Sequence, residues 1–251
     1  MSAGFQEWLT ARTEEVAGPA GHLALTGTHP VHEPLVIDGV PGVWDVDGGR
    51  LTVTVEPGAP LTRDGRPLTG TSYVDGVLEA PGVTIRTLTR EDGPVVRTYE
   101  HAAPARAAFA GIDRYPYDER LRVPAVFEPY PQPQRATIPY QRDDVARPHE
   151  VPGELTFTLD GTPHRVRAFA GHGELWFVFA DATTGVSTYR PGRFVDALRD
   201  GDGYVVDFNR AYLPPCAFSD WYNCPLPPRE NVLSSPVEAG EKSVRGHAHP
   251  A

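Results

Sequence analysis

The chain is poor in cysteine, in basic residues and in long apolar runs, and each shortage argues against a class of protein. Its 251 residues include only 2 cysteines, too few for the disulfide frameworks of small secreted domains. The formal net charge of −10 argues against non-specific binding to nucleic acid or to an anionic membrane, since both depend on a basic surface. No apolar run approaches the ~20 residues that a membrane-spanning helix needs. We therefore expect neither nucleic acid nor membrane as a partner.

Familiar catalytic and targeting signals are also missing. The sequence has no G-x-S-x-G elbow, P-loop or G-x-G-x-x-G, which argues against the common hydrolase, nucleotide and dinucleotide folds. His29 and His32 form H-x-x-H beside Glu33, but neighbouring prolines place them in a loop, so we expect no metal and no cofactor. The first fifteen residues lack a basic segment followed by an apolar core, so a cytoplasmic location is expected. Whether the protein is an enzyme stays open.

Proline and glycine, in contrast, are abundant. The chain has 27 prolines and 25 glycines, as expected of many turns and short strands. Apolar residues at helical spacing predict a single helix over residues 4–17, which Gly18-Pro19 ends. Period-two alternation or apolar runs of strand length then predict strands at 50–56, 83–85, 95–99, 120–128, 155–159, 166–168, 175–180 and 204–208. Asp92-Gly93 and Asp160-Gly161 predict the turns of two hairpins. We expect a mainly β protein, antiparallel and barrel-like or sandwich-like, with one N-terminal helix.

The domain organisation leaves one question open. We expect a single β-rich domain over residues 1–251. Residues 129–139, PYPQPQRATIP, are rich in proline and glutamine. They form either an internal boundary or a long surface crossover within one domain. Strand order and oligomeric state do not follow from the sequence.

The segment 207–242 is the most distinctive part of the chain. It has neither helical nor strand periodicity, yet it holds both cysteines and two Pro-Pro pairs. Long aperiodic loops in compact domains are usually functional or disordered, and aromatic residues argue against disorder. Ordering a residue costs about 1–2 kcal/mol, whereas burying a large apolar side chain returns roughly 1.5–3 kcal/mol. With Tyr212, Phe218, Trp221 and Tyr222 as anchors, we expect a long ordered loop packed on the sheet.

Four blocks in and before this segment form a pattern. They read FADATTGVSTYRPGRFV from 179 to 195, VVDFNRAYLPPCAF from 205 to 218, CPLPPREN from 224 to 231, and AGEK from 239 to 242. In this order they resemble the signature of a large bacterial and archaeal family of unknown function, and weaker resemblance covers most of the chain. The family typically has Asn where this chain has Leu213. The resemblance implies a motif map and no mechanism.

Polar residues at predicted strand ends are the candidate ligand-binding residues. Asp181 follows one apolar strand and Asp207 ends another, and loops at strand ends often carry sites. Arg193 and Arg97 have a fork of donors suited to a carboxylate or phosphate, so an anionic ligand is favoured. The full candidate set is Arg97, Asp181, Tyr189, Arg193, Asp207, Asn209 and Tyr212. The alternative is an Arg–Asp network that only attaches the loop to the sheet.

The cysteines have four alternative roles. Cys216 and Cys224 are too far apart in sequence for the usual C-x2-4-C zinc spacing. A disulfide needs their Cα atoms within about 7 Å. Two buried thiols are the third alternative. A nucleophilic cysteine is the fourth, and it needs a nearby base or positive charge.

Two functions from different classes are compatible with these observations. The first is a protein that binds a small molecule in a polar Arg/Asp/Asn pocket at strand ends, with the loop as wall or lid. The second is a protein-interaction module that presents the aromatic, proline-rich loop to a partner. The second predicts that Trp221 and Tyr222 are both exposed in one apolar patch.

Overall fold

The chain folds into two compact units. The computed structural model describes residues 3–90, 92–142, 146–171 and 174–246. The barrel unit consists of Met1–Leu9 and Ala110–Ala251, and the two-sheet unit of Thr10–Phe109. Residues 129–139 do not separate these units, because they lie within strand β12 (Arg122–Ile138).

The predicted N-terminal helix is confirmed as α1 (Ala3–Ala17), within which the chain passes from the barrel unit to the two-sheet unit. In the barrel unit, Phe5 packs its ring against Tyr117 at a centroid distance of 5.0 Å. A second, five-residue helix is α2 (Pro104–Ala108). Neither described helix is long and apolar enough to cross a membrane. The protein is mainly β, as expected.

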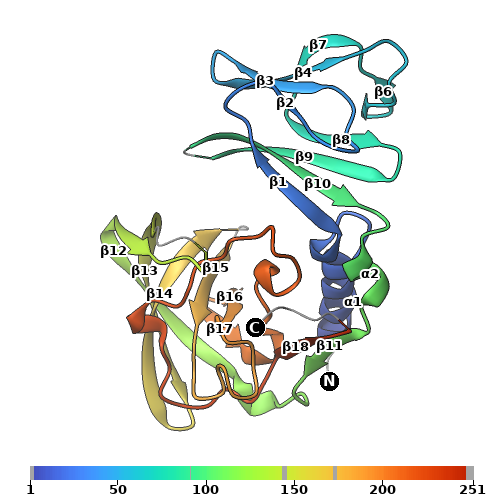
Figure 1. The fold of residues 1–251 in the computed structure, drawn as a ribbon. Helices are drawn as coiled ribbons and strands as arrows, with labels where there is room; N and C mark the ends of the chain where they lie inside the picture. Colours follow the sequence, from blue (N-terminus) through green and yellow to red (C-terminus); the bar gives the residue numbers. More distant parts are fainter. Residues whose placement is uncertain (1–2, 91, 143–145, 172–173, 247–251) are drawn as a thin grey trace. The chain divides into compact units, whose positions relative to one another are not determined.

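The barrel unit contains a closed six-stranded antiparallel barrel (Figure 1). Its strands follow one another around the barrel in sequence order, and β17 closes it by pairing with the start of β12. They are β12, β13 (Arg147–Leu159), β14 (Thr162–Gly171), β15 (Glu174–Phe179), β16 (Arg193–Asp200) and β17 (Gly203–Asp207). The barrel-like alternative of the sequence analysis is therefore confirmed.

Aromatic rings fill the barrel interior. Phe157, Phe177 and Phe208 lie within one buried cluster, with ring centroids 5.5 Å apart for Phe157–Phe208 and 6.1 Å apart for Phe157–Phe177. The apolar run 175–180 supplies Phe177 as the central strand β15, which pairs with β14 on one side and β16 on the other. Burial of such side chains is the main favourable term in folding.

The tight turn between β13 and β14 has the residues that its geometry requires. Asp160 and Gly161 have φ angles of 48° and 75°, the left-handed values of a two-residue type I′ turn. Aspartate tolerates this conformation better than most residues, and glycine adopts it freely. The hairpin predicted from Asp160-Gly161 is confirmed, and Asp160 is held at one end of the barrel.

The proline-rich stretch 129–139 belongs to the β12–β13 hairpin. The pairing register shifts between Pro129 and Gln134, where β12 has extra residues opposite β13. Prolines lack the N–H that a strand ladder needs, so they are tolerated at such irregular places and at strand edges.

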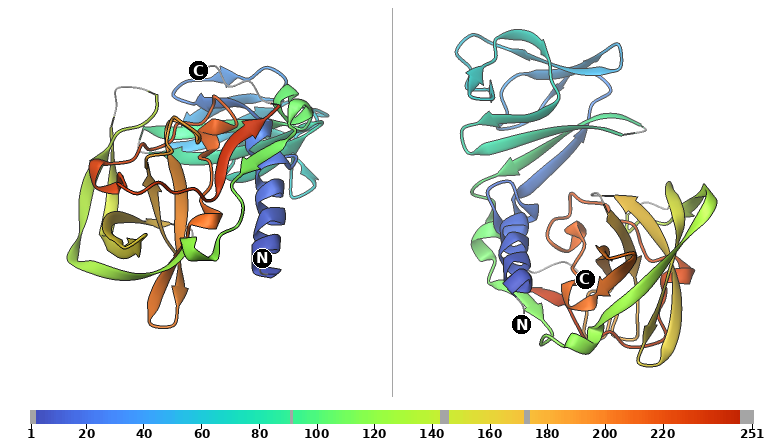
Figure 2. Two further views of the ribbon diagram at one scale, coloured as in Figure 1. Left: turned by 90° about the horizontal axis from the view of Figure 1, so that it is seen from below. Right: turned by 180° about the vertical axis from the view of Figure 1, so that it is seen from behind.

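After β17 the chain runs irregularly over the barrel until β18 (Glu241–Arg245), as the orange-to-red segment in Figure 2 shows. Single 3-10 turns interrupt it at η3 (Phe208–Arg210), η4 (Pro215–Ala217) and η5 (Arg229–Asn231). Phe218 and Tyr222 are buried, as expected of anchoring residues, whereas Trp221 is exposed and does not anchor the segment. Strand β18 pairs with β11 (Gly111–Arg114), and neither strand was predicted.

The two-sheet unit buries a separate core between two antiparallel sheets, with Trp44 and Leu61 fully buried. One sheet has the order β1-β10-β9-β8-β5-β6, and the other β2-β3-β4-β7. The strands are β1 (Leu25–Pro30), β2 (Leu35–Val36), β3 (Val43–Asp47), β4 (Arg50–Val55), β5 (Thr62–Arg63), β6 (Arg66–Pro67), β7 (Gly70–Tyr73), β8 (Gly76–Ala80), β9 (Val83–Arg90) and β10 (Gly93–Glu100). The predicted hairpin around Asp92-Gly93 is present as β9 and β10.

Truncation of the barrel core should be costly. For Phe177→Ala we expect the free energy of unfolding to fall by about 3–5 kcal/mol, because the fully buried ring leaves a cavity. Urea denaturation followed by tryptophan fluorescence measures it. The control Val186→Ala, at a side chain that is 85% exposed, should change it by less than ~0.5 kcal/mol. Equal effects of the two substitutions would contradict the assigned core.

Candidate functional site

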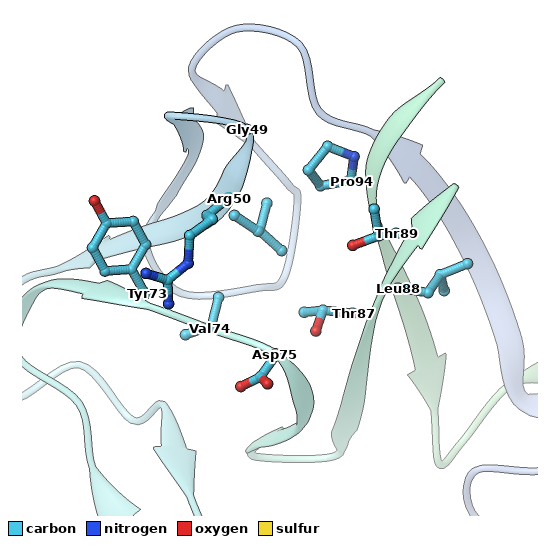
Figure 3. A pocket seen from close by; sticks show the side chains of 10 residues that line it. Gly49, Arg50, Tyr73, Val74, Asp75, Thr87, Leu88, Thr89 and Pro94 are labelled. Atoms are coloured by element: carbon cyan, nitrogen blue, oxygen red, sulfur yellow. The ribbon is translucent and has the colours of Figure 1, made fainter. Parts of the chain in front are cut away.

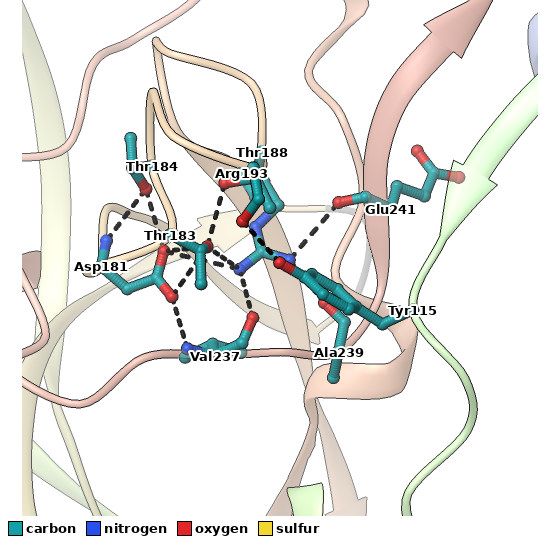
Figure 4. Close-up of polar contacts among 10 residues, drawn as sticks. Tyr115, Asp181, Thr183, Thr184, Thr188, Arg193, Val237, Ala239 and Glu241 are labelled. Atoms are coloured by element: carbon teal, nitrogen blue, oxygen red, sulfur yellow. Dashed lines mark hydrogen bonds and ion pairs between the residues drawn. The ribbon is translucent and has the colours of Figure 1, made fainter.

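Arg193 is the centre of the largest polar cluster in the barrel unit (Figure 4). It begins β16 and its side chain is fully buried. The Nη2 atom donates to the carbonyl of Val237 at 2.9 Å, and Nη1 donates to the carbonyl of Ala239 and, at 3.4 Å, to that of Glu241. Three alternate carbonyls of the C-terminal segment therefore bind one guanidinium group.

Asp181 completes this cluster. Its Oδ1 lies 3.5 Å from Nη2 of Arg193, and its Oδ2 accepts a hydrogen bond from the backbone N–H of Val237. Thr183 and Thr184 donate their hydroxyls to the same carboxylate. Burial lowers the pKa of Arg193, and the carboxylate of Asp181 opposes that shift. A buried charge is tolerated only when it is paired and hydrogen-bonded in this way.

Asp207 and Asn209 form a second group at the end of β17. The Asp207 carboxylate accepts bonds from the backbone N–H and the side-chain Nδ2 of Asn209, at 3.1 and 2.9 Å. The Asn209 amide in turn accepts from the backbone N–H of Asp118 at 2.8 Å and donates to its carbonyl at 2.9 Å. Asn209 thus takes the place of a neighbouring strand for Asp118.

Two further asparagines repeat this arrangement. Asn223 bonds to both the backbone N–H and the carbonyl of Arg142, at 3.0 and 2.8 Å. Asn231 does the same with Arg167, at 2.8 and 3.1 Å, and also donates to the carbonyl of Val178. Sequence reasoning did not single out either residue, because an asparagine in a loop carries no local signal of a distant backbone partner.

The remaining candidates are Tyr189, Tyr212 and Arg97. Tyr189 donates its hydroxyl to the carbonyl of Cys216 at 3.3 Å. Tyr212 exchanges backbone hydrogen bonds with Phe194 and donates its hydroxyl to Asp196 at 3.4 Å. Arg97 lies on β10 in the two-sheet unit.

The structure therefore brings Asp181 together with Arg193, and Asp207 together with Asn209. Within the described residues, no hydrogen bond or ion pair links one pair to the other. Leu213, at the position where the family has Asn, is fully buried, and its backbone N–H donates to Oε2 of the buried Glu241 at 2.8 Å.

A cavity of about 170 Å³ opens in the barrel unit next to the Asp207–Asn209 group. We call it the barrel-end cavity. Arg120 chelates the Asp118 carboxylate, with Nη2 2.6 Å from Oδ2, and this bond holds the pKa of Asp118 below its usual range. The cavity lining consists of Asp118, Arg120, Leu121, Asp160, Pro236 and Glu238.

A second cavity, of about 210 Å³, lies in the two-sheet unit (Figure 3). The guanidinium carbon of Arg50 lies 4.1 Å from the ring centroid of Tyr73. The Tyr73 hydroxyl donates to the Asp47 carboxylate, and this bond raises the pKa of Tyr73. Thr87 and Thr89 line the opposite wall from β9. The cavity combines a positive charge, an aromatic ring and hydroxyl groups.

Comparison with known proteins assigns the barrel unit to a family. The model of the family described as "Protein of unknown function (DUF1684)" matches residues 107–242. The chain belongs to the DUF1684 family. This match contains all four motif blocks, whereas nearly all of the two-sheet unit lies outside it.

Among solved structures, the NMR solution structure of an uncharacterized protein from Haloarcula marismortui is similar to this DUF1684 protein. The two sequences are 35% identical over 55% of this chain and 79% of that chain, with a TM-score of 0.45. No curated protein matches the chain.

Sequence reasoning missed the residues that line the barrel-end cavity. Asp118 caps the short η2 turn (Glu119–Leu121) and Asp160 lies in the hairpin turn, so both read locally as turn residues. Glu238 lies in the aperiodic segment. Only their proximity in space distinguishes them. Among the described residues, no three His, Cys, Asp or Glu side chains gather where they could hold a metal ion.

Removal of the Arg193 guanidinium should loosen the C-terminal segment. For Arg193→Met we expect the free energy of unfolding to fall by about 3–5 kcal/mol, because a buried Asp181 charge loses its partner. Chemical denaturation measures the change, and limited proteolysis should show earlier cleavage within 233–241. The matched control Arg199→Met removes an exposed arginine of the same strand and should cost less than ~1 kcal/mol. Equal losses would show that the Arg193 cluster does not stabilise the fold.

Proposed function

We propose that this DUF1684 protein binds a small, positively charged polar molecule in the barrel-end cavity. The observation that carries the proposal is the cavity itself, whose wall at Asp118 is held by Asn209. Asn209 and the neighbouring Asp207 are two of the residues that the sequence marks as candidates. The cavity differs from the expected Arg/Asp/Asn pocket, because Asp207 and Asn209 lie behind its wall and none of the candidate residues lines it. The proposal includes no reaction.

The charge of the ligand follows from the carboxylates. Asp118 and Arg120 neutralise each other through their ion pair. Asp160 and Glu238 have no cationic side chain within ion-pairing distance in the described part of the chain. Two unit charges 4 Å apart interact by about 1 kcal/mol in water and about 4 kcal/mol near a protein surface. An ammonium or guanidinium group is therefore favoured here.

This ligand class differs from the anionic one that Arg97 and Arg193 suggested. The Nη atoms of Arg193 donate hydrogen bonds to backbone carbonyls of the protein. The guanidinium group is therefore already bound and does not favour an anionic ligand. The size of the cavity also limits the ligand. Pockets for drug-sized ligands measure about 300–1,000 Å³, so 170 Å³ suits a molecule of the size of an amino acid or a short diamine.

Binding can be tested with defined compounds at constant ionic strength. We expect ethanolamine, putrescine or arginine to raise the Tm, because a ligand at a hundred times its Kd stabilises by about 2.7 kcal/mol. Sodium acetate and phosphate should not. Calorimetric titration of the compound with the largest shift should show at least a tenfold loss of affinity in the double variant Asp160→Asn/Glu238→Gln.

The control double variant Glu150→Gln/Asp202→Asn removes two exposed carboxylates of the same unit outside the cavity and should bind normally. An equal loss of affinity in both double variants would show that the compound responds to the net charge of the protein and not to the cavity. The absence of any shift with the cationic compounds would reject the proposal.

A second candidate function is protein interaction through the loop, and the exposure of Trp221 favours it. Trp221 is 48% exposed, but Tyr222 is only 8% exposed, so one of the two expected aromatics faces solvent. The ion pair between Arg142 and Asp220, at 2.6 Å, holds the adjoining loop. Tryptophan is enriched among residues that dominate binding interfaces.

Site-specific photocrosslinking tests this candidate. A benzophenone side chain in place of Trp221 should give one discrete crosslinked product in the cells that produce the protein. The same group in place of Val186, which is more exposed, should give none. Equal yields at both positions, or no product at 221, would reject an interaction surface at Trp221.

A further inference from the structure

The thiol of Cys224 reaches the backbone of Cys216, although the two residues lie on different turns. The backbone N–H of Cys216 points at Sγ of Cys224, with 3.4 Å between nitrogen and sulfur. With an N–Cα bond of about 1.46 Å, this sulfur lies at most ~4.9 Å from Cα of Cys216. Cα atoms joined by a disulfide are usually ~5.5–6 Å apart. The Cys224 sulfur thus lies within the reach of the Cys216 side chain.

The backbones that carry the two sulfurs are fixed. On the first turn, the N–H of Ala217 donates to the carbonyl of Pro214 at 2.9 Å. On the second, Gln141 donates its N–H to the carbonyl of Cys224 at 3.0 Å, and Leu226 bonds to Pro139 at 2.8 Å. Both cysteines are thus held by the barrel unit, and both thiols are buried.

A tyrosine hydroxyl faces this thiol pair. The hydroxyl oxygen of Tyr189 lies 4.0 Å from Sγ of Cys216, and Gln141 Nε2 lies 3.4 Å from the same oxygen. Burial and the Cys216 thiol raise the pKa of Tyr189, so the phenol remains a neutral donor. In the reduced protein this hydroxyl donates to the Cys216 carbonyl at 3.3 Å, and rotation about its C–O bond would direct the same proton at the sulfur when negative charge develops there.

We propose that Cys216 and Cys224 form an oxidation site, at which a peroxide converts the two thiols into an intramolecular disulfide. One thiolate attacks a peroxide oxygen, the O–O bond breaks, and the first water leaves with the thiol proton. The second thiol then attacks the resulting sulfenic acid, the S–O bond breaks, and the second water leaves. The sulfur pair loses two electrons, and hydrogen peroxide is reduced to two waters.

Oxidation at this site has a local consequence. The disulfide closes a nine-residue ring from Cys216 to Cys224, which contains the exposed Trp221. Cross-linking restricts the unfolded chain, and a ring of this length gives a smaller gain than a long one. The oxidised protein should therefore melt several degrees higher than the reduced protein, and proteases should cut the 217–223 loop more slowly.

The full chain serves for the test. The reduced protein is treated with hydrogen peroxide in small excess, and its mass and its thiol count in denaturant are measured. We expect a loss of 2 Da, loss of both thiols, and a peptide that joins Cys216 to Cys224. Dithiothreitol should restore the thiols and the original mass and Tm.

Single variants separate this pathway from independent oxidation. Cys216→Ser and Cys224→Ser each keep one thiol, so peroxide should leave a sulfenic acid that a dimedone probe captures. Tyr189→Phe should slow disulfide formation several-fold without changing the product. Gains of 16 or 32 Da per thiol in the unaltered protein, or two thiols that survive the excess peroxide, would overturn the proposal. A dimer joined by a disulfide would also overturn it.

Discussion

The irregular segment between β17 and β18 must satisfy its backbone polar groups without a strand partner, and the barrel unit depends on how it does so. A buried N–H or C=O without a partner costs about as much as a lost hydrogen bond. Here side chains supply the partners. Arg193 binds the carbonyls of Val237 and Ala239, and Asp181 accepts the backbone N–H of Val237. Val237 and Ala239 are buried and Glu238 between them is exposed. This stretch therefore resembles a β-strand whose hydrogen-bond partners are side chains.

Three asparagine side chains of the same segment form hydrogen bonds to backbone groups outside the segment. Asparagine carries a donor and an acceptor on one short side chain, so it can bond to the N–H and the carbonyl of a single residue, as a strand neighbour would. Asn209, Asn223 and Asn231 each do this. Aspartate in their place would lose the donor and set a negative charge against a carbonyl oxygen. The polar residues of the family motif therefore have a structural role whatever ligand the protein binds.

Local signals made much of this architecture predictable. The helix followed from its apolar spacing, and Asp160-Gly161 specified a type I′ hairpin because the turn requires left-handed φ at both residues. The pairing of β11 with β18 was not predictable, since each strand is short and its partner is far away in the sequence. The same limit applies to the site. Asn209 and its partner Asp118 are 91 residues apart, and no pattern within a window of residues connects them.

The alternation of side chains along a strand is also informative only locally. The alternation of β10 places Arg97 on the same face as Val95 and Tyr99, which are both buried, but it does not say which residues cover that face. The structure adds which charged side chains have an ion-pair partner, and the sequence alone does not give this. Buried charges of the barrel unit are paired, Arg193 with Asp181 and Glu241 with Arg114, because an unpaired charge there would not be tolerated. Charges that can still interact with a solute must then lie at the surface, where Asp160 and Glu238 border a cavity. Asp160 and Glu238, which have no ion-pair partner among the described residues, are therefore the carboxylates through which this unit can bind a cationic solute.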